Sequence, residues 1–533
     1  MAFIDIERLT FSYGDQGDRP VLNDVSLSIE EGELLLLCGA SASGKTTLLR
    51  LIKHLIAPYG NKSGTIYMNG TNIEQMSERE LVSKIGFVFQ NPDHQIVCEE
   101  PFAELAFGLE NLGVSSNEIR HRVAEMANFF GIQHFFTKNV HALSGGQKQL
   151  LNLAAIMVMQ PDVLILDEPT AMLDPICTDD FLNILKKLNE EMGLTIILCE
   201  HHLDKVYSMA DKVCILDKGS ILFSGDAKEG AGHIFRESIS TALSMPAASK
   251  LYMKYDKAPG NKIPLTVKEG RGWLNALPPS QISEITEIEK TSALEKENKI
   301  PAFHLKKVFF RYDKKEEFVL NNLNLTGFQN EILTVVGGNG SGKSTLLSVL
   351  SGYRNPTLGK VIKGKTGYMP QDPSLLFSED TVEEVIANTL SSYELDIETA
   401  EQFSRSFPSI RRILSDPMAN PLDLSGGQKQ LLAFYKLALL DLDCLILDEP
   451  VKGLDGLAKK ELADILTSFA KKGVCVLMVT HDLEFAAMVS DRIGMLFQGE
   501  IISLGSPVDF FSSNHFYTTS RCKIGKGMIP DLI

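Results

Sequence analysis

The sequence predicts an α/β protein in which one fold occurs twice, each copy being a largely parallel sheet flanked by helices. Three observations predict it. Six sequence features occur twice in the same order, which indicates an internal repeat. Each half alternates apolar strand-like runs with helical stretches, the runs being LLLLCG, VLILDEP and TIILCEH, then ILTVVGG, CLILDEP and VCVLMVTH. Each half also places a G-x-x-x-x-G-K-[ST] loop between an apolar run and a leucine-rich stretch.

The spacing of the repeated features is regular. The interval from Gln90 to Ser144 is 54 residues, and the same interval separates their counterparts in the second half, Gln371 and Ser425. The first half alone contains about 17 further residues, NGTNIEQMSERELVSKI. We therefore expect one fold used twice, with an addition in the first copy.

Domain boundaries follow from the repeat. We predict one domain over residues 1–235, a linker over 236–300 and a second domain over 301–533. The linker holds several prolines and the mixed-charge tract EITEIEKTSALEKENK, so we expect a tether with one short helix.

Composition restricts the function classes. The formal net charge is -16, so the whole chain lacks the basic field that favours nucleic-acid binding. The start MAFIDIERLT does not resemble a signal peptide, and no apolar run approaches the ~18 residues of a membrane helix. The eight cysteines form no CxxC pair, which fits reduced thiols in the cytosol.

The two glycine-rich loops predict phosphate binding. Glycines let the backbone curl with several N–H groups pointing at an anion, the following helix N-terminus favours negative charge, and a lysine adds a point charge. The residues predicted to bind ATP through these loops are Gly39, Ala40, Ser41, Ala42, Ser43, Gly44, Lys45, Thr46, Thr47, Gly337, Gly338, Asn339, Gly340, Ser341, Gly342, Lys343, Ser344 and Thr345.

A pair of carboxylates closes one apolar run in each half, Asp167-Glu168 and Asp448-Glu449. Adjacent residues on a strand face opposite ways, so the two can have different roles. Magnesium prefers hard oxygens and retains waters, so we assign the aspartates to it through water and the hydroxyls after each lysine as direct ligands. The glutamates then orient or deprotonate the attacking water. The predicted magnesium residues are Thr46, Asp167, Ser344 and Asp448.

The segment LSGGQKQ, at 143–149 and again at 424–430, resembles the signature of ATP-binding-cassette (ABC) ATPases. Its Ser-Gly-Gly start offers backbone N–H groups at the beginning of a helix, an anion site without its own lysine. The resemblance covers nearly all of the chain except the linker. It implies two tandem P-loop cassettes, each with a small antiparallel β-subdomain and a helical subdomain that carries the signature.

In the family, nucleotide is clamped between one cassette's phosphate loop and the other cassette's signature. The resemblance therefore implies that Lys45, Asp167, Glu168 and His201 pair with Ser425 and Gly427, and that Lys343, Asp448, Glu449 and His481 pair with Ser144 and Gly146. The signature residues it implies are Ser144, Gly145, Gly146, Gln147, Ser425, Gly426, Gly427 and Gln428.

Further residues match the family pattern one by one. Tyr13 and Tyr312 resemble the aromatic that stacks on adenine, and Gln90 and Gln371 resemble the glutamine that links magnesium to the transporter contact. Asp174 and Asp455 resemble the loop that joins the two sites. The catalytic residues implied are Glu168, His201, Glu449 and His481.

Three positions depart from the pattern. Ala42 stands where many relatives carry Gly or Cys, which a loop tolerates if φ is negative there. Val451 replaces the usual Thr, which removes a hydroxyl but no catalytic group. His202 follows His201 where Asp is commoner, so the sequence leaves open which of the two histidines acts.

The stretch FVFQNPDHQIVCEEPFAELAFGLENLGV resembles the corresponding region of energy-coupling-factor (ECF) ATPases, which drive uptake of vitamins or transition-metal ions. The C-terminal HFYTTSR is similar to fused members of that group. We expect an importer ATPase that uses ATP and Mg²⁺, with a coupling protein and a substrate-binding component as membrane partners, peripheral at the cytoplasmic face of the cell membrane. The alternatives are a double cassette acting on ribosomes or nucleic acid, and a sugar-importer ATPase.

Overall fold

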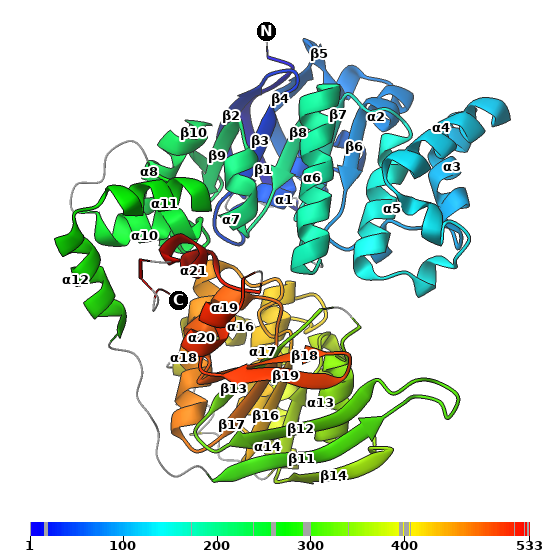
Figure 1. Cartoon of the computed structure of the whole chain (residues 1–533). Helices are drawn as coiled ribbons and strands as arrows, with labels where there is room; N and C mark the ends of the chain where they lie inside the picture. Colours follow the sequence, from blue (N-terminus) through cyan, green and yellow to red (C-terminus); the bar gives the residue numbers. More distant parts are fainter. Residues whose placement is uncertain are drawn as a thin grey trace. The chain divides into compact units, whose positions relative to one another are not determined.

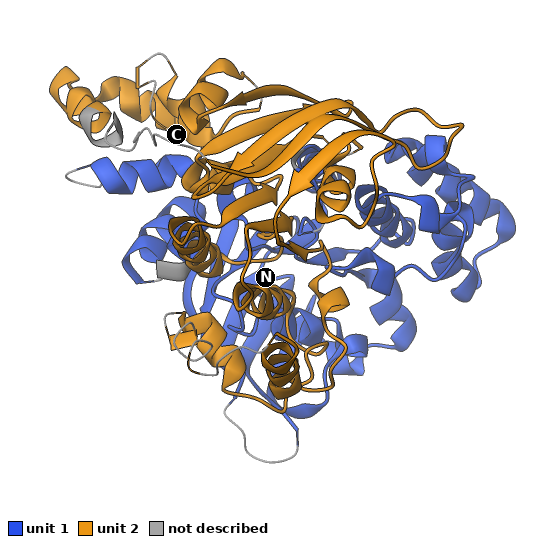
Figure 2. Ribbon diagram, turned by 90° about the horizontal axis from the view of Figure 1, so that it is seen from below, with its two compact units in different colours: residues 1–266 blue, residues 267–533 orange. Residues whose placement is uncertain are grey.

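The computed structural model describes residues 2–14, 20–171, 173–237, 239–256, 263–290, 300–338, 340–393, 398, 404–405, 407–515, 517–526, 528–529 and 532. The chain divides into two compact units, unit 1 over Met1–Thr266 and unit 2 over Val267–Ile533 (Figure 2). Among the described helices, none has the length and apolar character needed to cross a bilayer.

Unit 1 is built on a six-stranded sheet in the order β10-β9-β3-β8-β7-β6 (Figure 1). All neighbouring strands are parallel except β10, which pairs antiparallel with β9. The central strands are buried at every position, which explains their unbroken apolar sequence. The strands are β3 (Leu34–Cys38), β6 (Ile85–Val88), β7 (Val163–Asp167), β8 (Thr195–Cys199), β9 (Lys212–Asp217) and β10 (Ser220–Asp226).

A smaller antiparallel sheet, in the order β2-β1-β4-β5, packs its apolar residues into the same core. Helices α3, α4 and α5 lie together beside the parallel sheet and form the helical part of unit 1 (Figure 1). The strands are β1 (Ile4–Tyr13), β2 (Leu22–Ile29), β4 (Gly60–Met68) and β5 (Thr71–Asn72). The α-helices up to residue 237 are α1 (Lys45–Ile52), α2 (Glu78–Lys84), α3 (Pro101–Asn111), α4 (Ser116–Phe129), α5 (Gly145–Met157), α6 (Pro175–Met192), α7 (Leu203–Val206) and α8 (Ala227–Glu237).

Unit 2 repeats this plan. Its six-stranded sheet has the order β15-β16-β17-β13-β18-β19, again parallel except at the last strand, and its antiparallel sheet has the order β12-β11-β14. The strands are β11 (Pro301–Phe310), β12 (Leu320–Phe328), β13 (Ile332–Val336), β14 (Leu358–Lys363), β15 (Thr366–Met369), β16 (Cys444–Asp448), β17 (Cys475–Val479), β18 (Arg492–Phe497) and β19 (Glu500–Gly505). The helices after β11 are α13 (Lys343–Ser351), α14 (Val382–Ser392), α16 (Pro408–Leu414), α17 (Gly426–Ala438), α18 (Gly456–Lys471), α19 (Leu483–Val489), α20 (Pro507–Ser513) and α21 (Ser520–Gly525).

The predicted fold class is confirmed: both units carry a mostly parallel sheet, a small antiparallel sheet and helices. The 17 residues unique to the first half form β5, a short 3-10 turn and α2. In unit 2, β14 leads directly to β15 through Gly364 and Lys365.

The segment 236–300 differs from the single short helix expected. Its described part contains α9 (Ile239–Leu243), α10 (Ala247–Tyr255), α11 (Val267–Ala276) and α12 (Pro279–Lys290). The boundary between units falls inside it, and α11 belongs to unit 2, where Arg271 Nε donates to Lys523 O at 2.7 Å near α21. The segment folds into packed helices because α10 and α11 each bury a leucine on an apolar face. The domain limits 235 and 301 stay a prediction.

Candidate functional site

The first glycine-rich loop connects β3, in the middle of the sheet, to α1 (Lys45–Ile52). Gly39 has φ 146°, and a Cβ there would lie 2.0 Å from Leu216 O of β9, so only glycine fits. Lys45 is buried, and its Nζ donates to Gly39 O at 3.0 Å and Ala40 O at 2.8 Å. The lysine is therefore held over the loop, where it can meet a phosphate oxygen.

The second loop repeats this geometry between β13 and α13 (Lys343–Ser351). Lys343 Nζ donates to Gly337 O at 2.9 Å and to Gly338 O at 3.0 Å. Ser43 Oγ and Ser341 Oγ, one in each loop, are buried without a hydrogen-bond partner among the described residues. Unpaired hydroxyls in a glycine-rich loop fit an anionic ligand such as a phosphate, because an unpaired buried hydroxyl is otherwise costly.

The backbone at Ala42 does not have the negative φ that we expected from the sequence. Its φ is 61°, in the left-handed region, and its counterpart Gly340 has φ 77°. The expectation of a negative φ is therefore wrong, and the loop of unit 1 holds a non-glycine residue in a strained conformation. The adjacent predicted residue Asn339 lies outside the described residues.

The predicted magnesium oxygens lie together in both units. Thr46 Oγ1 donates to Asp167 Oδ1 at 3.2 Å, and Ser344 is hydrogen-bonded to Asp448. Burial, together with the charge of Glu168, raises the pKa of Asp167 to about 6, against the hydrogen bond from Thr46. Burial likewise raises the pKa of Asp448. A hydroxyl and a carboxylate on neighbouring elements are the donor set that Mg²⁺ takes, so these residues fit the ion.

Glu168 follows Asp167 with φ 48°, a left-handed turn that aims its side chain away from the strand. Its Oε1 lies 2.8 Å from His201 Nε2, and its Oε2 accepts from Gln90 Nε2 at 2.9 Å. Burial acts to raise the pKa of Glu168, but the hydrogen bond and charge of His201 outweigh it and the net pKa is lowered. The carboxylate is therefore held ionised at a fixed place. Of the two histidines, it is His201 that makes this contact.

Glu449 has the same left-handed turn, with φ 51°, but different partners. Its Oε2 accepts from the backbone N–H of His481 at 3.1 Å, and its Oε1 lies 3.3 Å from His481 Nε2. Burial raises the pKa of Glu449 to about 7, against the His481 hydrogen bond. Gln371, the counterpart of Gln90, is exposed and makes no hydrogen bond to Glu449 within the described residues.

The signature serines begin helices in both units. Ser144 and Ser425 are the N-caps of α5 and α17, and each forms a capping box with the glutamine three residues on, Gln147 or Gln428. The cap occupies one backbone N–H, and the other first-turn N–H groups at the glycines have no partner inside the helix. Each helix start can therefore accept an anion.

The remaining predicted residues lie near the loops or at helix starts. Tyr13 and Tyr312 are half exposed, and their hydroxyls lie 2.8 Å from Thr47 Oγ1 and 2.9 Å from Thr345 Oγ1. Arg354 stacks on one face of Tyr312, 4.7 Å from the ring centroid. Asp174 and Asp455 are the N-caps of α6 and α18.

The structure adds residues that the sequence did not single out. Glu200, directly before His201, accepts from Thr170 Oγ1 at 2.7 Å. Three side chains of the signature helix α5 hold the segment around Gln90. Lys148 Nζ contacts Asp93 Oδ1 at 2.6 Å. Gln149 Nε2 donates to Phe89 O at 3.1 Å, and Asn152 Nδ2 donates to Pro92 O at 3.2 Å. Polar residues inside an otherwise apolar helix were the available signal for the last two.

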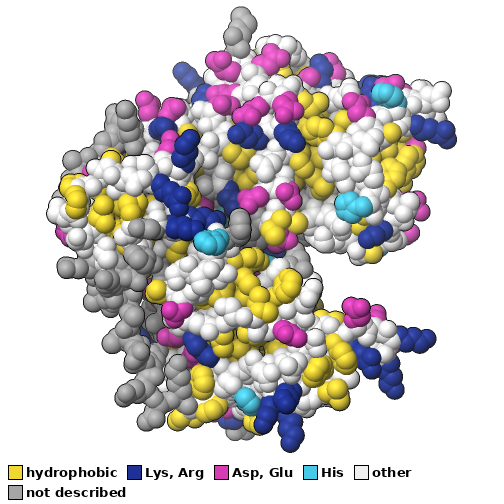
Figure 3. Space-filling model, viewed as in Figure 1, with side chains coloured by type: hydrophobic (Ala, Val, Ile, Leu, Met, Phe, Trp, Pro, Cys, Tyr) yellow, Lys and Arg dark blue, Asp and Glu magenta, His cyan; other side chains and the backbone are white. Residues whose placement is uncertain are grey.

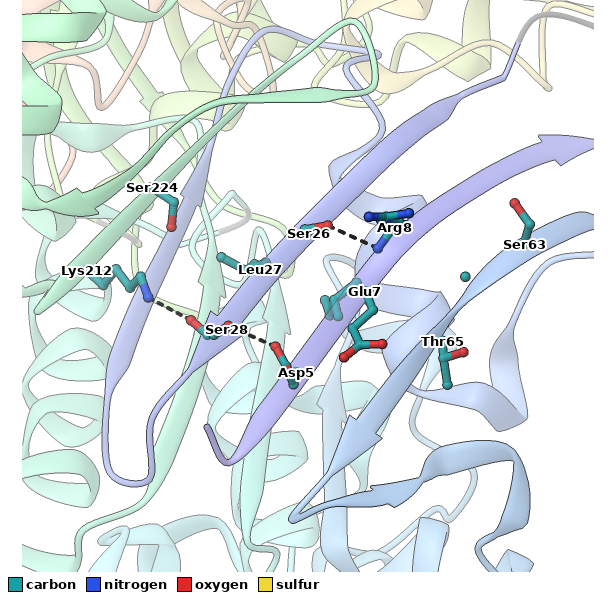
Figure 4. Close-up of a pocket in the computed structure, with 12 residues that line it drawn as sticks. Asp5, Glu7, Arg8, Ser26, Leu27, Ser28, Ser63, Thr65, Lys212 and Ser224 are labelled. Carbon is teal, nitrogen blue, oxygen red and sulfur yellow. Dashed lines mark hydrogen bonds between the residues drawn. The ribbon is translucent and has the colours of Figure 1, made fainter. Parts of the chain in front are cut away.

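A separate hollow of about 960 Å³ lies over the antiparallel sheet of unit 1 (Figure 4). Lys212 Nζ donates to Ser28 O at 2.7 Å, and Ser28 Oγ donates to Asp5 Oδ1 at 2.8 Å. Its lining residues come from β1, β2, β4, β9 and β10, and none belongs to the glycine-rich loop. The hollow is therefore not part of the candidate site.

Comparison with known proteins decides the family. Residues 22–171 and 320–452 match the family described as ABC transporter, one match in each unit. This chain belongs to the ABC transporter family. A Bacillus cereus protein described as an ABC transporter ATP-binding protein is 38% identical over 99% of this chain and 96% of its own length. The resemblance inferred from LSGGQKQ is confirmed. ATP-binding domains of ABC transporters bind ATP and are ATPases coupled to transport, and this chain carries two of them.

Two further proteins are similar. The Bacillus subtilis protein named as the HMP/thiamine import ATP-binding protein YkoD is 28% identical over 96% of this chain and 92% of its own length. A solved structure described as cbiO1 from Clostridium perfringens, part of the ABC transporter complex cbiONQ, is 30% identical with a TM-score of 0.41, and covers 48% of this chain and 95% of that one. ABC ATP-binding proteins work with membrane subunits.

Proposed function

We propose that this ABC protein is the ATP-binding subunit of an importer of the ECF type, which hydrolyses ATP at two sites to drive uptake of a vitamin or a transition-metal ion through separate membrane subunits. The observation that carries the two-site part is that each unit brings a loop lysine, an aspartate–hydroxyl pair and a glutamate–histidine contact to the same edge of its sheet. Both sites are therefore chemically complete on their own side.

The proposal that the chain serves an importer is supported by sequence similarity and by charge. The stretch at 87–114 resembles ECF ATPases, and the similarity to the import protein YkoD extends over nearly the whole chain. The net charge of -16, and acidic side chains interspersed with basic ones on the visible face (Figure 3), favour a transport partner over nucleic acid or the ribosome. We place the protein at the cytoplasmic face of the membrane, bound to a coupling protein and a substrate-binding component.

In this proposal each site residue has its own step. Lys45 and Lys343 meet the outer phosphate oxygens, and the orphaned loop serines donate to them. Glu168 and Glu449 accept the proton of the attacking water, with His201 and His481 holding the carboxylates in place. Mg²⁺, held by Thr46, Asp167 and Gln90 in unit 1 and by Ser344, Asp448 and Gln371 in unit 2, would neutralise phosphate charge.

We further propose that the two cassettes pair within one chain, so that each nucleotide is completed by the signature of the other unit. The support is chemical: the Ser144 and Ser425 helix starts offer N–H groups without a lysine, while each loop offers a lysine. Fusion in one polypeptide makes such pairing intramolecular, at an effective concentration on the order of millimolar.

The test is steady-state ATPase activity of Glu168→Gln, Glu449→Gln and the double variant, with Glu110→Gln on the exposed side of α3 as control. Each single substitution is expected to lower turnover at least about twofold, and the pair to lower it about 100- to 10,000-fold, because a positioned base contributes that much. If either single variant turns over ATP at the wild-type rate, the two sites do not take equal part.

The transport role needs its own experiment. We expect the chain to co-purify from detergent-solubilised membranes with integral membrane proteins, identified by mass spectrometry. Co-purification with ribosomes instead would overturn the importer proposal. Because unit 1 alone carries β5 and α2, we expect crosslinks to the membrane partner to be unequal near Gln90 and Gln371; equal crosslinks would contradict this.

A further inference from the structure

Glu200 is a buried carboxyl immediately before His201, and it binds the turn that follows β7. Its side chain is 1% exposed, and its Oε1 accepts from Thr170 N at 3.0 Å and from Thr170 Oγ1 at 2.7 Å. Thr170 is itself buried. Both donors of Thr170 are thus satisfied by one carboxyl at the end of β8.

The turn that contains Thr170 also carries Glu168. Its backbone is linked internally, since Ala171 N donates to Glu168 O at 3.2 Å and Leu173 N donates to Thr170 O at 3.0 Å. Glu168 N donates to Cys199 O at 2.9 Å, so the turn is fixed to the end of β8 at two points, one on each side of Pro169. Two attachments prevent the turn from rotating, where one would not.

This attachment bears on the glutamate–histidine contact. Glu168 sits at φ 48°, a conformation that persists only where the surroundings enforce it. His201 is the next residue after Glu200, so the segment that anchors the turn also presents Nε2 to Glu168 at 2.8 Å. Glu168 and His201 are therefore both positioned by the two attachments between the turn and the end of β8.

Unit 2 provides a natural comparison, because strand register aligns the two sites. Asp167 pairs with Cys199 across β7 and β8, and Asp448 pairs with Val479 across β16 and β17. The counterpart of Glu200 is therefore Thr480, and that of Thr170 is Val451, which has no hydroxyl.

The first attachment remains in unit 2, where Glu449 N donates to Val479 O at 2.9 Å. The second is missing, because Thr480 Oγ1 accepts from Asp482 N at 3.1 Å within its own segment. His481 Nε2 lies 3.3 Å from Glu449 Oε1, against 2.8 Å in unit 1. The unit with the Glu200–Thr170 pair has the shorter contact.

We propose that Glu200 is a positioning residue for ATP hydrolysis in unit 1, which fixes the Glu168 carboxylate against His201 by clamping the turn at Thr170. It does not touch the reacting atoms and acts through the turn. Unit 2 lacks this clamp, so the two catalytic carboxylates are held in different ways: Glu449 Oε2 instead accepts directly from the backbone N–H of His481. The inference rests on the proposed role of Glu168 as the residue that activates water.

The test exchanges the pair rather than deleting it. Thr170→Val combined with Glu200→Thr gives unit 1 the pair that unit 2 already packs in its own core, so folding is expected to survive. In a Glu449→Gln background, which reports on unit 1, we expect kcat for ATP to fall about tenfold, because loss of a buried hydrogen bond corresponds to about that factor. KM for ATP should stay within about twofold, because the loop residues that bind phosphate are untouched.

Glu104→Ala is the matched control. Glu104 is also buried, 6% exposed, and its Oε2 accepts from Val97 N at 3.0 Å and from Cys98 N at 2.8 Å, so its loss removes two bonds of the same kind away from Glu168. We expect Glu104→Ala to lower the melting temperature while kcat stays within about twofold of its background.

The outcomes separate the inference from its premise. If the exchanged pair keeps the background kcat while Glu168→Gln abolishes turnover, the positioning role is refuted and the role of Glu168 stands. If Glu168→Gln itself leaves unit 1 turnover unchanged, the premise fails. If Glu104→Ala lowers kcat as much as the exchange does, the effect is a general loss of stability and the inference is overturned.

Discussion

Replacing Ala42 by glycine is expected to stabilise unit 1. Ala42 has φ 61°, where a Cβ costs about 1–2 kcal/mol for an L-residue. The side chain is exposed, so its removal takes no apolar contact out of the core. The gain is reduced by the greater backbone entropy that glycine gives the unfolded chain, about 0.4–1 kcal/mol. The net stabilisation is about 0.5–1 kcal/mol.

The reverse exchange in unit 2 serves as the internal control. Gly340 has φ 77°, and a Cβ built there meets no atom within 4 Å. Gly340→Ala therefore adds conformational strain without a clash, and it should destabilise unit 2 by the same amount.

Thermal unfolding followed by calorimetry measures both variants. For units of this size 1 kcal/mol shifts the midpoint by about 2–4 °C, so the Ala42→Gly midpoint should rise by about 1–4 °C and the Gly340→Ala midpoint should fall similarly. The reasoning would be refuted if Ala42→Gly lowered the midpoint, or if both substitutions shifted it in the same direction.

Three further predictions concern unit 1. Gly39→Ala should weaken ATP binding about tenfold or more, measured by nucleotide titration, because its Cβ would lie 2.0 Å from Leu216 O. The control is Gly232→Ala in α8, outside the loop, where a Cβ would make only ordinary contacts and ATP should bind as in the wild type. Asn152→Ala should cost about 1–3 kcal/mol in denaturant unfolding, because Pro92 O loses a buried donor. Burial raises the pKa of Glu200 to about 8, against Thr170 and the His201 N–H and together with Glu168. A raised carboxyl pKa stabilises the fold at low pH, so wild type should lose stability relative to Glu200→Gln as pH rises from about 4.5 to 8; a constant difference in melting temperature would contradict this.

The amino-acid sequence alone predicts the duplicated fold. Both loops, both carboxylate pairs and both signature segments lie at strand ends or helix starts, because these motifs depend on residue type and short-range spacing. The addition in the first half was also visible as an unequal interval between repeats, and it forms β5 and α2.

The sequence did not predict two other features, the helices within 236–290 and the backbone conformation of Ala42. The helices within 236–290 were missed because prolines and mixed charges suggested a tether, while burial of their leucines depends on surfaces elsewhere in each unit. The positive φ of Ala42 could not be inferred from its residue type, because alanine adopts a positive φ only where the surrounding structure enforces it.

The sequence by itself determined that this ABC protein holds two cassettes, each with its own phosphate loop, acidic pair and signature. Local chemistry suffices for that, because each motif is contiguous. Only the tertiary structure decided how the two glutamates differ: Glu168 is joined to Gln90 and His201 beside the Glu200–Thr170 clamp, while Glu449 contacts His481 without one. Residues distant in sequence meet at a strand end only after the sheet has formed, and a difference of a few buried atoms then sets how each carboxylate is held.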